Sequence, residues 1–410
     1  MRAAVLAVVA ACAQTLPSPE APTVPRDRER HFTIWLGGAR VGTATERETW
    51  TASGVVLRRE EAMRFLRGEA TVALTTTIEV VADRTLAPSR VTWSERSDAA
   101  VVIIERHAEA VRDHAGHWTV DTEASVPDHA VPAELVPLIT RRDGRFAGSV
   151  FLPGRGFLAG SGRIDPIAPD RLVARLDLDG GAVAEATMDI DSSGEVVRVV
   201  DGDGVIAIRA TADVAAVAFA PVDLIAATAI PITGTPSFTL VVDATVAVPP
   251  IPGQSAHRDA AGTAVELSPR LPGALAPAAP GRDRSREITG IVAEVRARIA
   301  PDLSAHVATR DAGSATAGDC TTFALAYAGL ALRRAIPTRL VTGLRVDGNR
   351  LVRHRWAVSW TGRAWIAVDA AYGSVPAGGD LVGLAIHGAD DAGLVAGEAA
   401  LTQIRSAAWQ

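Results

Sequence analysis

Residues 318–339 read GDCTTFALAYAGLALRRAIPTR, and this stretch decides how the second half of the chain folds. From Thr321 to Ala335 the apolar residues recur at spacings of three and four, the period of a helix with one buried face. Ile336-Pro337 ends this pattern, and a β-rich stretch follows. We therefore predict a helix with Cys320 in its first turn, packed on a sheet.

Cys320 occupies a position where a thiol becomes reactive. Unpaired backbone N–H groups and the positive end of the helix dipole converge on the first turn of a helix, and both favour the nucleophilic thiolate. Asp319 is well suited to cap the helix start, and Gly318 permits a close backbone approach or a positive φ. The sequence therefore predicts a cysteine activated by its position.

A candidate base and its orienting group follow on one predicted hairpin. Residues 354–360 and 364–369 read as two strands joined by a turn at Thr361-Gly362. His354 and Asp369 stand at equal distances from this turn, which predicts that they are near-opposite neighbours. A histidine held by a carboxylate can take the proton of a thiol and later deliver it to a leaving amine.

An asparagine could orient the histidine equally well, but the only asparagine in the chain is Asn349, in the turn before His354. Asp369 is therefore the predicted third member, and the candidate catalytic residues are Cys320, His354 and Asp369.

Four motifs follow one another in a recognisable order: Gly318-Asp319-Cys320, Arg334-Ala335-Ile336-Pro337-Thr338-Arg339, His354-Arg355-Trp356 and Val368-Asp369-Ala370-Ala371. They resemble the bacterial transglutaminase-like superfamily, whose members read roughly G-x-C, R-x-G-I-P-A-R, H-x-W and V-D-P-T. The departures, such as Ala335 for Gly and Thr338 for Ala, fall on non-catalytic positions. The resemblance covers about residues 282–395 and implies a papain-like α+β domain with a Cys-His-Asp triad.

The resemblance implies a cysteine enzyme that forms a thioester with peptide or side-chain amides of a peptide or protein substrate. Hydrolysis, as in a protease or amidase, is the expected outcome, and transamidation stays open because the triad chemistry is shared. The rival hypothesis is a non-catalytic envelope binding or structural protein with a β ligand-binding domain and an inert transglutaminase-like scaffold. It predicts an unreactive Cys320.

Composition narrows the range of partners. The chain has 410 residues, a net charge of −6 and no basic run, which argues against nucleic acid as a partner. It contains no lysine, so a transamidase of this sequence could not cross-link to itself. We predict no cofactor and no metal, since His107, His114, His117 and Asp113 read as groups around a solvated turn. The sequence leaves the oligomeric state open.

The N-terminus predicts export. Residues 1–12 read as a signal peptide, and Val9-Ala10-Ala11-Cys12 resembles a lipobox, so lipidated Cys12 would anchor the protein to a membrane. The expected location is periplasmic or outer-membrane-anchored, with ordinary cleavage near Ala13 and secretion as the alternative. Since Cys12 and Cys320 are the only cysteines, no structural disulfide is expected.

The rest of the chain predicts a second, mainly β domain. A Pro-rich tether at residues 13–30 precedes residues 31–233, where short apolar runs alternate with turn signals. This pattern is typical of an antiparallel sheet, arranged as a half-barrel or sandwich, with a short helix at 132–139. Residues 234–281 read as a strand-containing linker, and the catalytic domain is expected at residues 282–410.

Overall fold

The chain folds into two compact units, Met1–Asp223 and Leu224–Gln410. The computed structural model describes residues 26–68, 70–99, 102–122, 124–178, 183–192, 194–202, 204–244, 248–259, 262–303, 312–401 and 404–410. The predicted signal peptide and lipidated Cys12 lie outside the described residues, as does most of the predicted tether. None of the helices in these ranges is long and apolar enough to cross a membrane.

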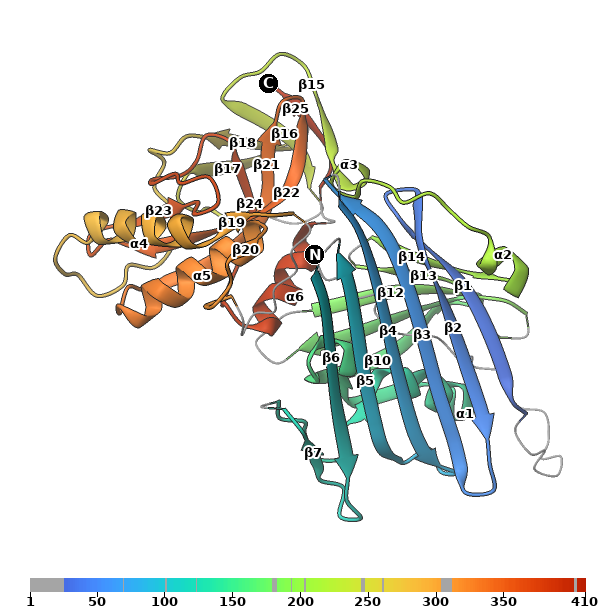
Figure 1. Ribbon diagram of the computed structural model, residues 1–410. Helices are drawn as coiled ribbons and strands as arrows, with labels where there is room; N and C mark the ends of the chain where they lie inside the picture. The colour runs from blue at the N-terminus through green and yellow to red at the C-terminus, as the bar shows by residue number, and fades with distance from the viewer. Residues whose placement is uncertain are drawn as a thin grey trace. The chain divides into compact units, whose positions relative to one another are not determined.

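The first unit is built on a 14-stranded sheet (Figure 1). Its strands are β1 (Arg28–Leu36), β2 (Ala39–Trp50), β3 (Gly54–Arg67), β4 (Ala70–Asp83), β5 (Pro88–Ala99), β6 (Val102–Arg112), β7 (Trp118–Val120), β8 (Val131–Pro132), β9 (Phe146–Leu152), β10 (Leu158–Ala168), β11 (Arg171–Leu178), β12 (Val183–Ile190), β13 (Val196–Asp201) and β14 (Val205–Ala210). The helical turns are η1 (Ala133–Leu135), α1 (Val136–Asp143), η2 (Pro153–Arg155) and α2 (Ala212–Ala216).

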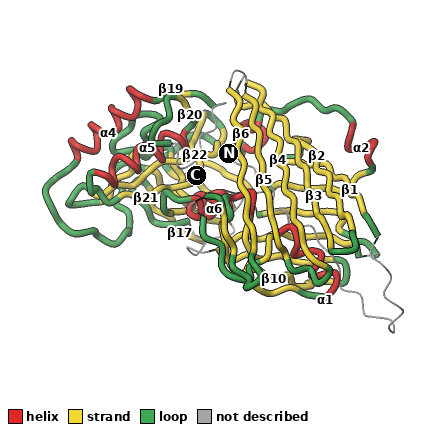
Figure 2. The backbone as a smooth tube through the Cα atoms, turned by 60° about the horizontal axis from the view of Figure 1, so that its bottom comes forward, coloured by secondary structure: helices red, strands yellow, loops and turns green. Residues whose placement is uncertain are grey.

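Two runs of strands meet in the middle of this sheet, where β1 pairs with β14. One run passes from β1 to β7 and the other from β14 back to β8, with neighbours antiparallel except for the parallel pair of β8 and β9. The prediction of a large antiparallel sheet is confirmed, and Figure 2 shows how little helix this unit contains. The predicted helix at 132–139 begins as η1 and continues as α1 to Asp143.

The two runs pack on a shared core, because alternate side chains of each strand point to the same face. Val80 of β4 and Trp93 of β5 belong to one run, whereas Phe151 and Ala159 belong to β9 and β10 of the other. Leu138 of α1 completes the cluster. The sheet is therefore curved around an apolar interior.

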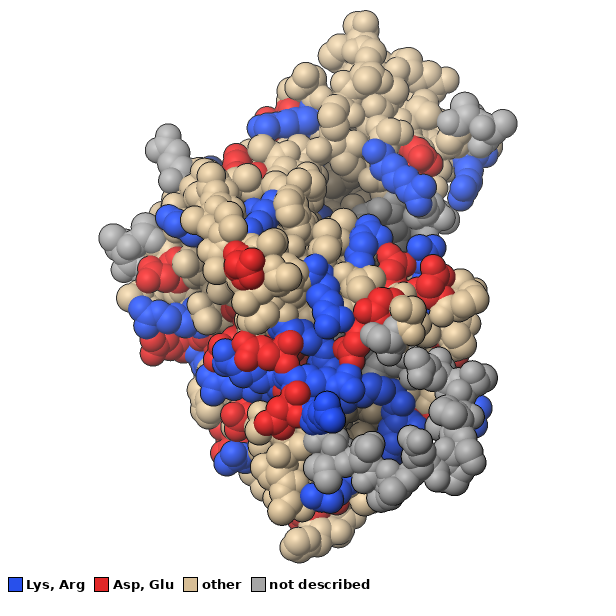
Figure 3. All heavy atoms as spheres, turned by 90° about the vertical axis from the view of Figure 1, so that its right-hand side faces the viewer, with Lys and Arg blue, Asp and Glu red and all other residues tan. Residues whose placement is uncertain are grey.

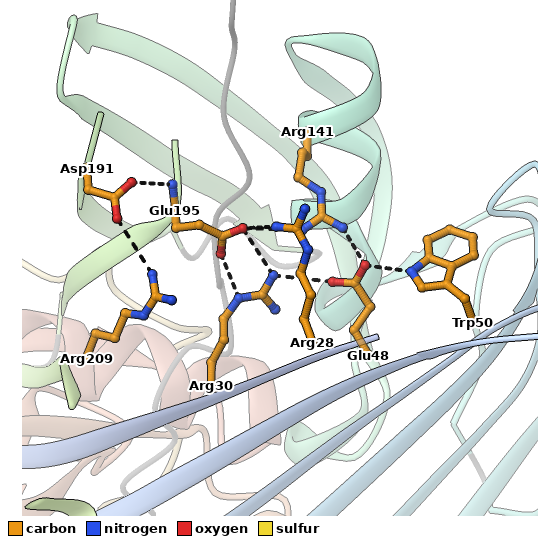
Figure 4. A network of polar contacts seen from close by, with 8 residues as sticks. All are labelled: Arg28, Arg30, Glu48, Trp50, Arg141, Asp191, Glu195 and Arg209. Atoms are coloured by element: carbon orange, nitrogen blue, oxygen red, sulfur yellow. Dashed lines mark hydrogen bonds and ion pairs between the residues drawn. The ribbon is translucent and has the colours of Figure 1, made fainter. Parts of the chain in front are cut away.

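Charged side chains are also held inside this unit (Figure 4). Glu48 of β2 is 1% exposed and accepts hydrogen bonds from Trp50, Arg141 and Arg30. Arg30 in turn donates to Glu195 at 2.7 Å. Since Arg141 lies in α1 and Glu195 lies just before β13, the network joins the helix and both runs of strands. Buried charges are tolerated where they are paired in this way.

Ion pairs also cross the sheet between exposed side chains. Arg58 of β3 pairs with Glu79 of β4 at 3.9 Å, and Arg90 of β5 pairs with Glu79 at 3.5 Å and with Glu109 of β6 at 4.0 Å. Figure 3 shows basic and acidic side chains interspersed on one face of the molecule. Pairs of this exposed kind contribute little to stability.

The second unit contains a nine-stranded sheet in the order β17-β18-β16-β25-β15-β22-β21-β24, with β23 paired to β22. Its strands are β15 (Ile230–Thr233), β16 (Thr239–Ala244), β17 (Gln254–Asp259), β18 (Gly262–Leu267), β21 (Thr338–Asp347), β22 (Arg350–Trp360), β23 (Trp365–Val368), β24 (Leu381–His387) and β25 (Ile404–Trp409). A separate parallel pair is formed by β19 (Ala300–Pro301) and β20 (Ala317–Gly318). The helices are α3 (Leu224–Thr228), α4 (Ser285–Arg298), α5 (Cys320–Arg333) and α6 (Asp391–Ala400).

Two of these helices form the main core of the second unit with the sheet. Ile288 and Val295 of α4 and Tyr327 of α5 are buried in one cluster with Ala357 of β22 and Val368 of β23. Tyr327 also bonds to Ser359 of β22 through their hydroxyl groups at 2.8 Å. The apolar spacing in the sequence thus correctly predicts α5, as well as the sheet beneath it.

The boundaries of the two units, the tether and the linker differ from those predicted from the sequence. The units divide after Asp223 and not after residue 233, and β1 already begins at Arg28, within the predicted tether. The segment read as a linker, 234–281, supplies β16, β17 and β18 to the sheet of the second unit. The physical reason is burial, since Leu240 and Val265 belong to the same core as Val382 of β24. These strands have no core without that sheet.

Candidate active site

Cys320 is the first residue of α5, as the sequence predicts. The Asp319 side chain caps the helix by accepting the backbone N–H of Thr322 at 3.1 Å. Gly318 meets the need for close approach, because a Cβ there would lie 2.3 Å from Cβ of Thr322. Cys320 is half-buried and lies at the positive end of the helix dipole.

His354 and Asp369 are brought together by the hairpin of β22 and β23. His354 Nε2 and Asp369 Oδ2 are 2.8 Å apart, and the two side chains are 6% and 2% exposed. The register differs from the predicted one, since Ala357 pairs with Val368 and the hairpin loop spans residues 361–364. Asp369 is therefore the diagonal neighbour of His354. Both still lie on the same face, because the shift is by two residues.

The carboxylate of Asp369 is fixed by its own loop. Its Oδ1 accepts the backbone N–H groups of Ala371 at 3.1 Å and Tyr372 at 3.3 Å. Its backbone also exchanges two hydrogen bonds with Ser374. With Oδ1 occupied in this way, Oδ2 is left to hold the His354 ring in one orientation.

The environment of His354 favours its protonated form. Burial alone would lower the pKa of His354, but hydrogen bonds to Asp369 and Cys320 and the negative charges of both raise that pKa to about 9. Since Nε2 faces Asp369, Nδ1 is the ring nitrogen left for the sulfur of Cys320. This arrangement can carry an ion pair of thiolate and imidazolium.

Aromatic rings flank His354 on two sides. Trp356 stacks on it with ring centroids 6.0 Å apart, and Tyr372 approaches edge-on at 5.5 Å. Trp356 is 1% exposed, whereas Tyr372 is 58% exposed. The buried Trp356 ring therefore shields one side of His354 from solvent, and the Tyr372 ring beside His354 is itself exposed to solvent.

Sequence reasoning missed a buried polar cluster behind the catalytic helix. Arg355 is 4% exposed and donates to Thr321 at 3.1 Å, to Thr342 at 2.9 Å and to Glu398 of α6 at 2.8 Å. His387 of β24 bonds to the same Thr342 hydroxyl at 2.8 Å. The only signal in the sequence was an arginine between His354 and Trp356, in a strand that also contains Arg350 and Arg353.

The histidine in this cluster, His387, is neutral. The pKa of His387 is lowered to about 4, mainly by burial and to a smaller extent by the positive charge of Arg355. Its Nδ1 lies 2.7 Å from the carbonyl oxygen of Gly388, which fixes the ring. His387 therefore acts as an uncharged hydrogen-bonding group at neutral pH.

No group of three or more His, Cys, Asp or Glu side chains suited to a metal ion occurs in the described ranges. His117 and Asp113, part of the solvated turn noted in the sequence, pair at 3.1 Å with both side chains more than half exposed.

Residues 279–370 match the sequence profile of the transglutaminase-like superfamily. The matched segment contains α4, α5 and the β22–β23 hairpin, whereas β24, α6 and β25 follow it. No curated protein and no solved structure gives a significant match to the chain. The predicted resemblance is confirmed, and the second unit of this chain contains a transglutaminase-like superfamily domain at residues 279–370.

Proposed function

We propose that this protein is a cysteine-dependent amidase or protease in which Cys320, His354 and Asp369 form the catalytic triad. The observation that carries the proposal is the orientation of His354, whose Nε2 is 2.8 Å from Asp369 while its other side bonds to Cys320 at the start of α5. The domain match supports cysteine chemistry of this kind.

In the first step, the Cys320 thiolate attacks the carbonyl carbon of an amide. The C–N bond breaks, and His354 gives its proton to the departing amine, leaving a thioester on the sulfur. The N–H groups of the first turn of α5 are suited to stabilise the oxyanion, at about 3 kcal/mol for each donor.

In the second step, water attacks the thioester while His354 takes the proton from the water. A carboxylic acid leaves, and the thiolate is restored. Hydrolysis, with a peptide or protein as substrate, is our proposal over transamidation. We also propose that the protein is exported, on the strength of residues 1–12 alone.

Alkylation of the full chain carrying Cys12→Ser tests the proposal, because Cys320 is then the only thiol. We expect iodoacetamide to modify it rapidly at neutral pH, and His354→Ala to abolish that reactivity. A burst of one equivalent of nitrophenol from p-nitrophenyl acetate, absent in Cys320→Ala, would report the acyl-enzyme. Alkylation as slow as that of free cysteine in both proteins would favour the non-catalytic binding protein.

A further inference from the structure

Tyr372 presents an exposed aromatic surface beside the catalytic histidine. It is 58% exposed, an unusual state for a large ring. Its ring meets that of His354 edge-on, with centroids 5.5 Å apart and planes inclined by 71°. Because His354 bonds to Cys320, the ring surface lies one side chain away from the nucleophilic sulfur.

This ring is held in place despite its exposure. The guanidinium carbon of Arg345 lies 3.2 Å from the ring centroid of Tyr372. Arg345 is itself positioned by two carboxylates, since Nη2 is 2.9 Å from Asp380 and Nη1 is 3.9 Å from Asp369. The backbone N–H of Tyr372 is bonded to Asp369 as well. A side chain ordered in advance loses little conformational entropy when a ligand binds.

The contacts of the ring also limit what it can bind. Arg345 covers one face of the ring, and its positive charge repels a second cation at the opposite face, so a cationic ligand gains little there. The rest of the ring offers apolar surface, which favours aliphatic or aromatic groups. We propose that Tyr372 forms a subsite for an uncharged apolar group beside the scissile amide of the substrate. This inference rests on the proposed cysteine-dependent function.

Three chloroacetamides that differ in the group on the amide nitrogen test the subsite on the full chain carrying Cys12→Ser. They are chloroacetamide itself, its N-benzyl derivative and a derivative with a trimethylammonium-propyl group, and the measured quantity is the second-order rate of alkylation of Cys320. We expect the benzyl probe to react at least tenfold faster than chloroacetamide and the cationic probe to show no gain.

Tyr372→Ala should reduce the benzyl preference, measured as the ratio of the two alkylation rates within that variant, to about twofold or less. Tyr372→Phe should keep the preference, and Arg345→Met should weaken it by releasing the ring. Phe238→Ala is the matched control, because Phe238 is an 82% exposed ring in the turn before β16.

The outcomes separate the two proposals. A reactive thiol that shows no benzyl preference, or a preference that survives in Tyr372→Ala, overturns the subsite alone. A wild-type preference for the cationic probe also overturns it. A thiol as slow as free cysteine with chloroacetamide overturns the proposed function, and the subsite with it.

Discussion

Asp369 holds His354 through Nε2, at 2.8 Å, although the two residues are diagonal and not directly opposite in their hairpin. This contact selects the tautomer with hydrogen on Nε2 and turns Nδ1 toward Cys320. The negative charge of Asp369 also helps to keep His354 protonated, and its pKa is about 9. The carboxylate thus controls both the orientation and the charge of the base.

Asp369→Asn should separate these two effects. The amide oxygen can still accept the Nε2 hydrogen, but the charge is lost, so the pKa of His354 should fall by about one unit or more. We expect the alkaline limit of ester hydrolysis, near pH 9 in the wild type, to shift to lower pH by the same amount. Asp380→Asn is the control, because Asp380 binds Arg345 and not His354. If the alkaline limit of ester hydrolysis is unchanged in Asp369→Asn, the charge of Asp369 does not raise the pKa of His354.

The raised pKa of His354 should also make the stability of the second unit depend on pH. The folded protein binds this proton more tightly than the unfolded chain, whose histidine has a pKa near 6.5. The stabilisation is therefore complete below about pH 6.5 and is lost as the pH rises through about 9, with a limit of about 3 kcal/mol. Urea unfolding of the second unit at pH 6 and pH 9 measures the loss. His354→Gln should show a much smaller change over that range.

Much of this site was predictable because its signals are local. The spacing of Phe323, Tyr327 and Leu330 defines the buried face of α5, and the alternation of β22 places His354 beside Trp356. The predicted hairpin register was wrong by two residues, but the predicted proximity of Asp369 and His354 still holds. A shift by an even number of residues keeps Asp369 on the same face of the sheet.

The parts that were missed depend on contacts distant in sequence. Arg355 donates to Glu398, which lies 43 residues later on a helix that has no clear periodic signal in its sequence. In the same way, β25 joins the sheet between β15, which lies at the end of the predicted β-rich domain, and β16, which lies in the predicted linker. Local pattern cannot specify such pairings, because they are chosen by the shared core.

The pair of Arg355 and Glu398 should be important for the stability of the second unit. Glu398→Gln removes the carboxylate that neutralises the buried Arg355, so it should lower the free energy of unfolding by about 3 kcal/mol. Arg355→Met should cost less, because Glu398 keeps Arg353 at 4.0 Å. The double variant should lose clearly less than the sum of the two. Strictly additive losses from urea unfolding would show that the pair contributes no coupling.

Glu134 should make the first unit less stable as the pH rises. Burial raises its pKa to about 7, and its Oε2 has no hydrogen-bond partner. The folded protein therefore holds this proton more tightly than the unfolded chain, and the gain present below pH 4.5 is lost as the pH passes 7. Glu134→Gln should be more stable than wild type by about 1–2 kcal/mol at pH 8, with little difference at pH 4.5. Glu105→Gln, at an exposed ion pair, should differ little at either pH.

Gly318→Ala should displace the start of the catalytic helix. The added Cβ would lie 2.3 Å from Cβ and 2.4 Å from Oγ1 of Thr322, a side chain that is only 1% exposed and cannot move away. We expect a loss of about 2 kcal/mol in stability and at least a tenfold slower alkylation of Cys320, because the helix N-terminus that activates the thiol shifts. Gly313→Ala is the matched control in the turn before β20, since a Cβ there meets no atom within 4 Å. If Gly318→Ala and Gly313→Ala alkylate at the same rate, the thiol does not depend on this turn.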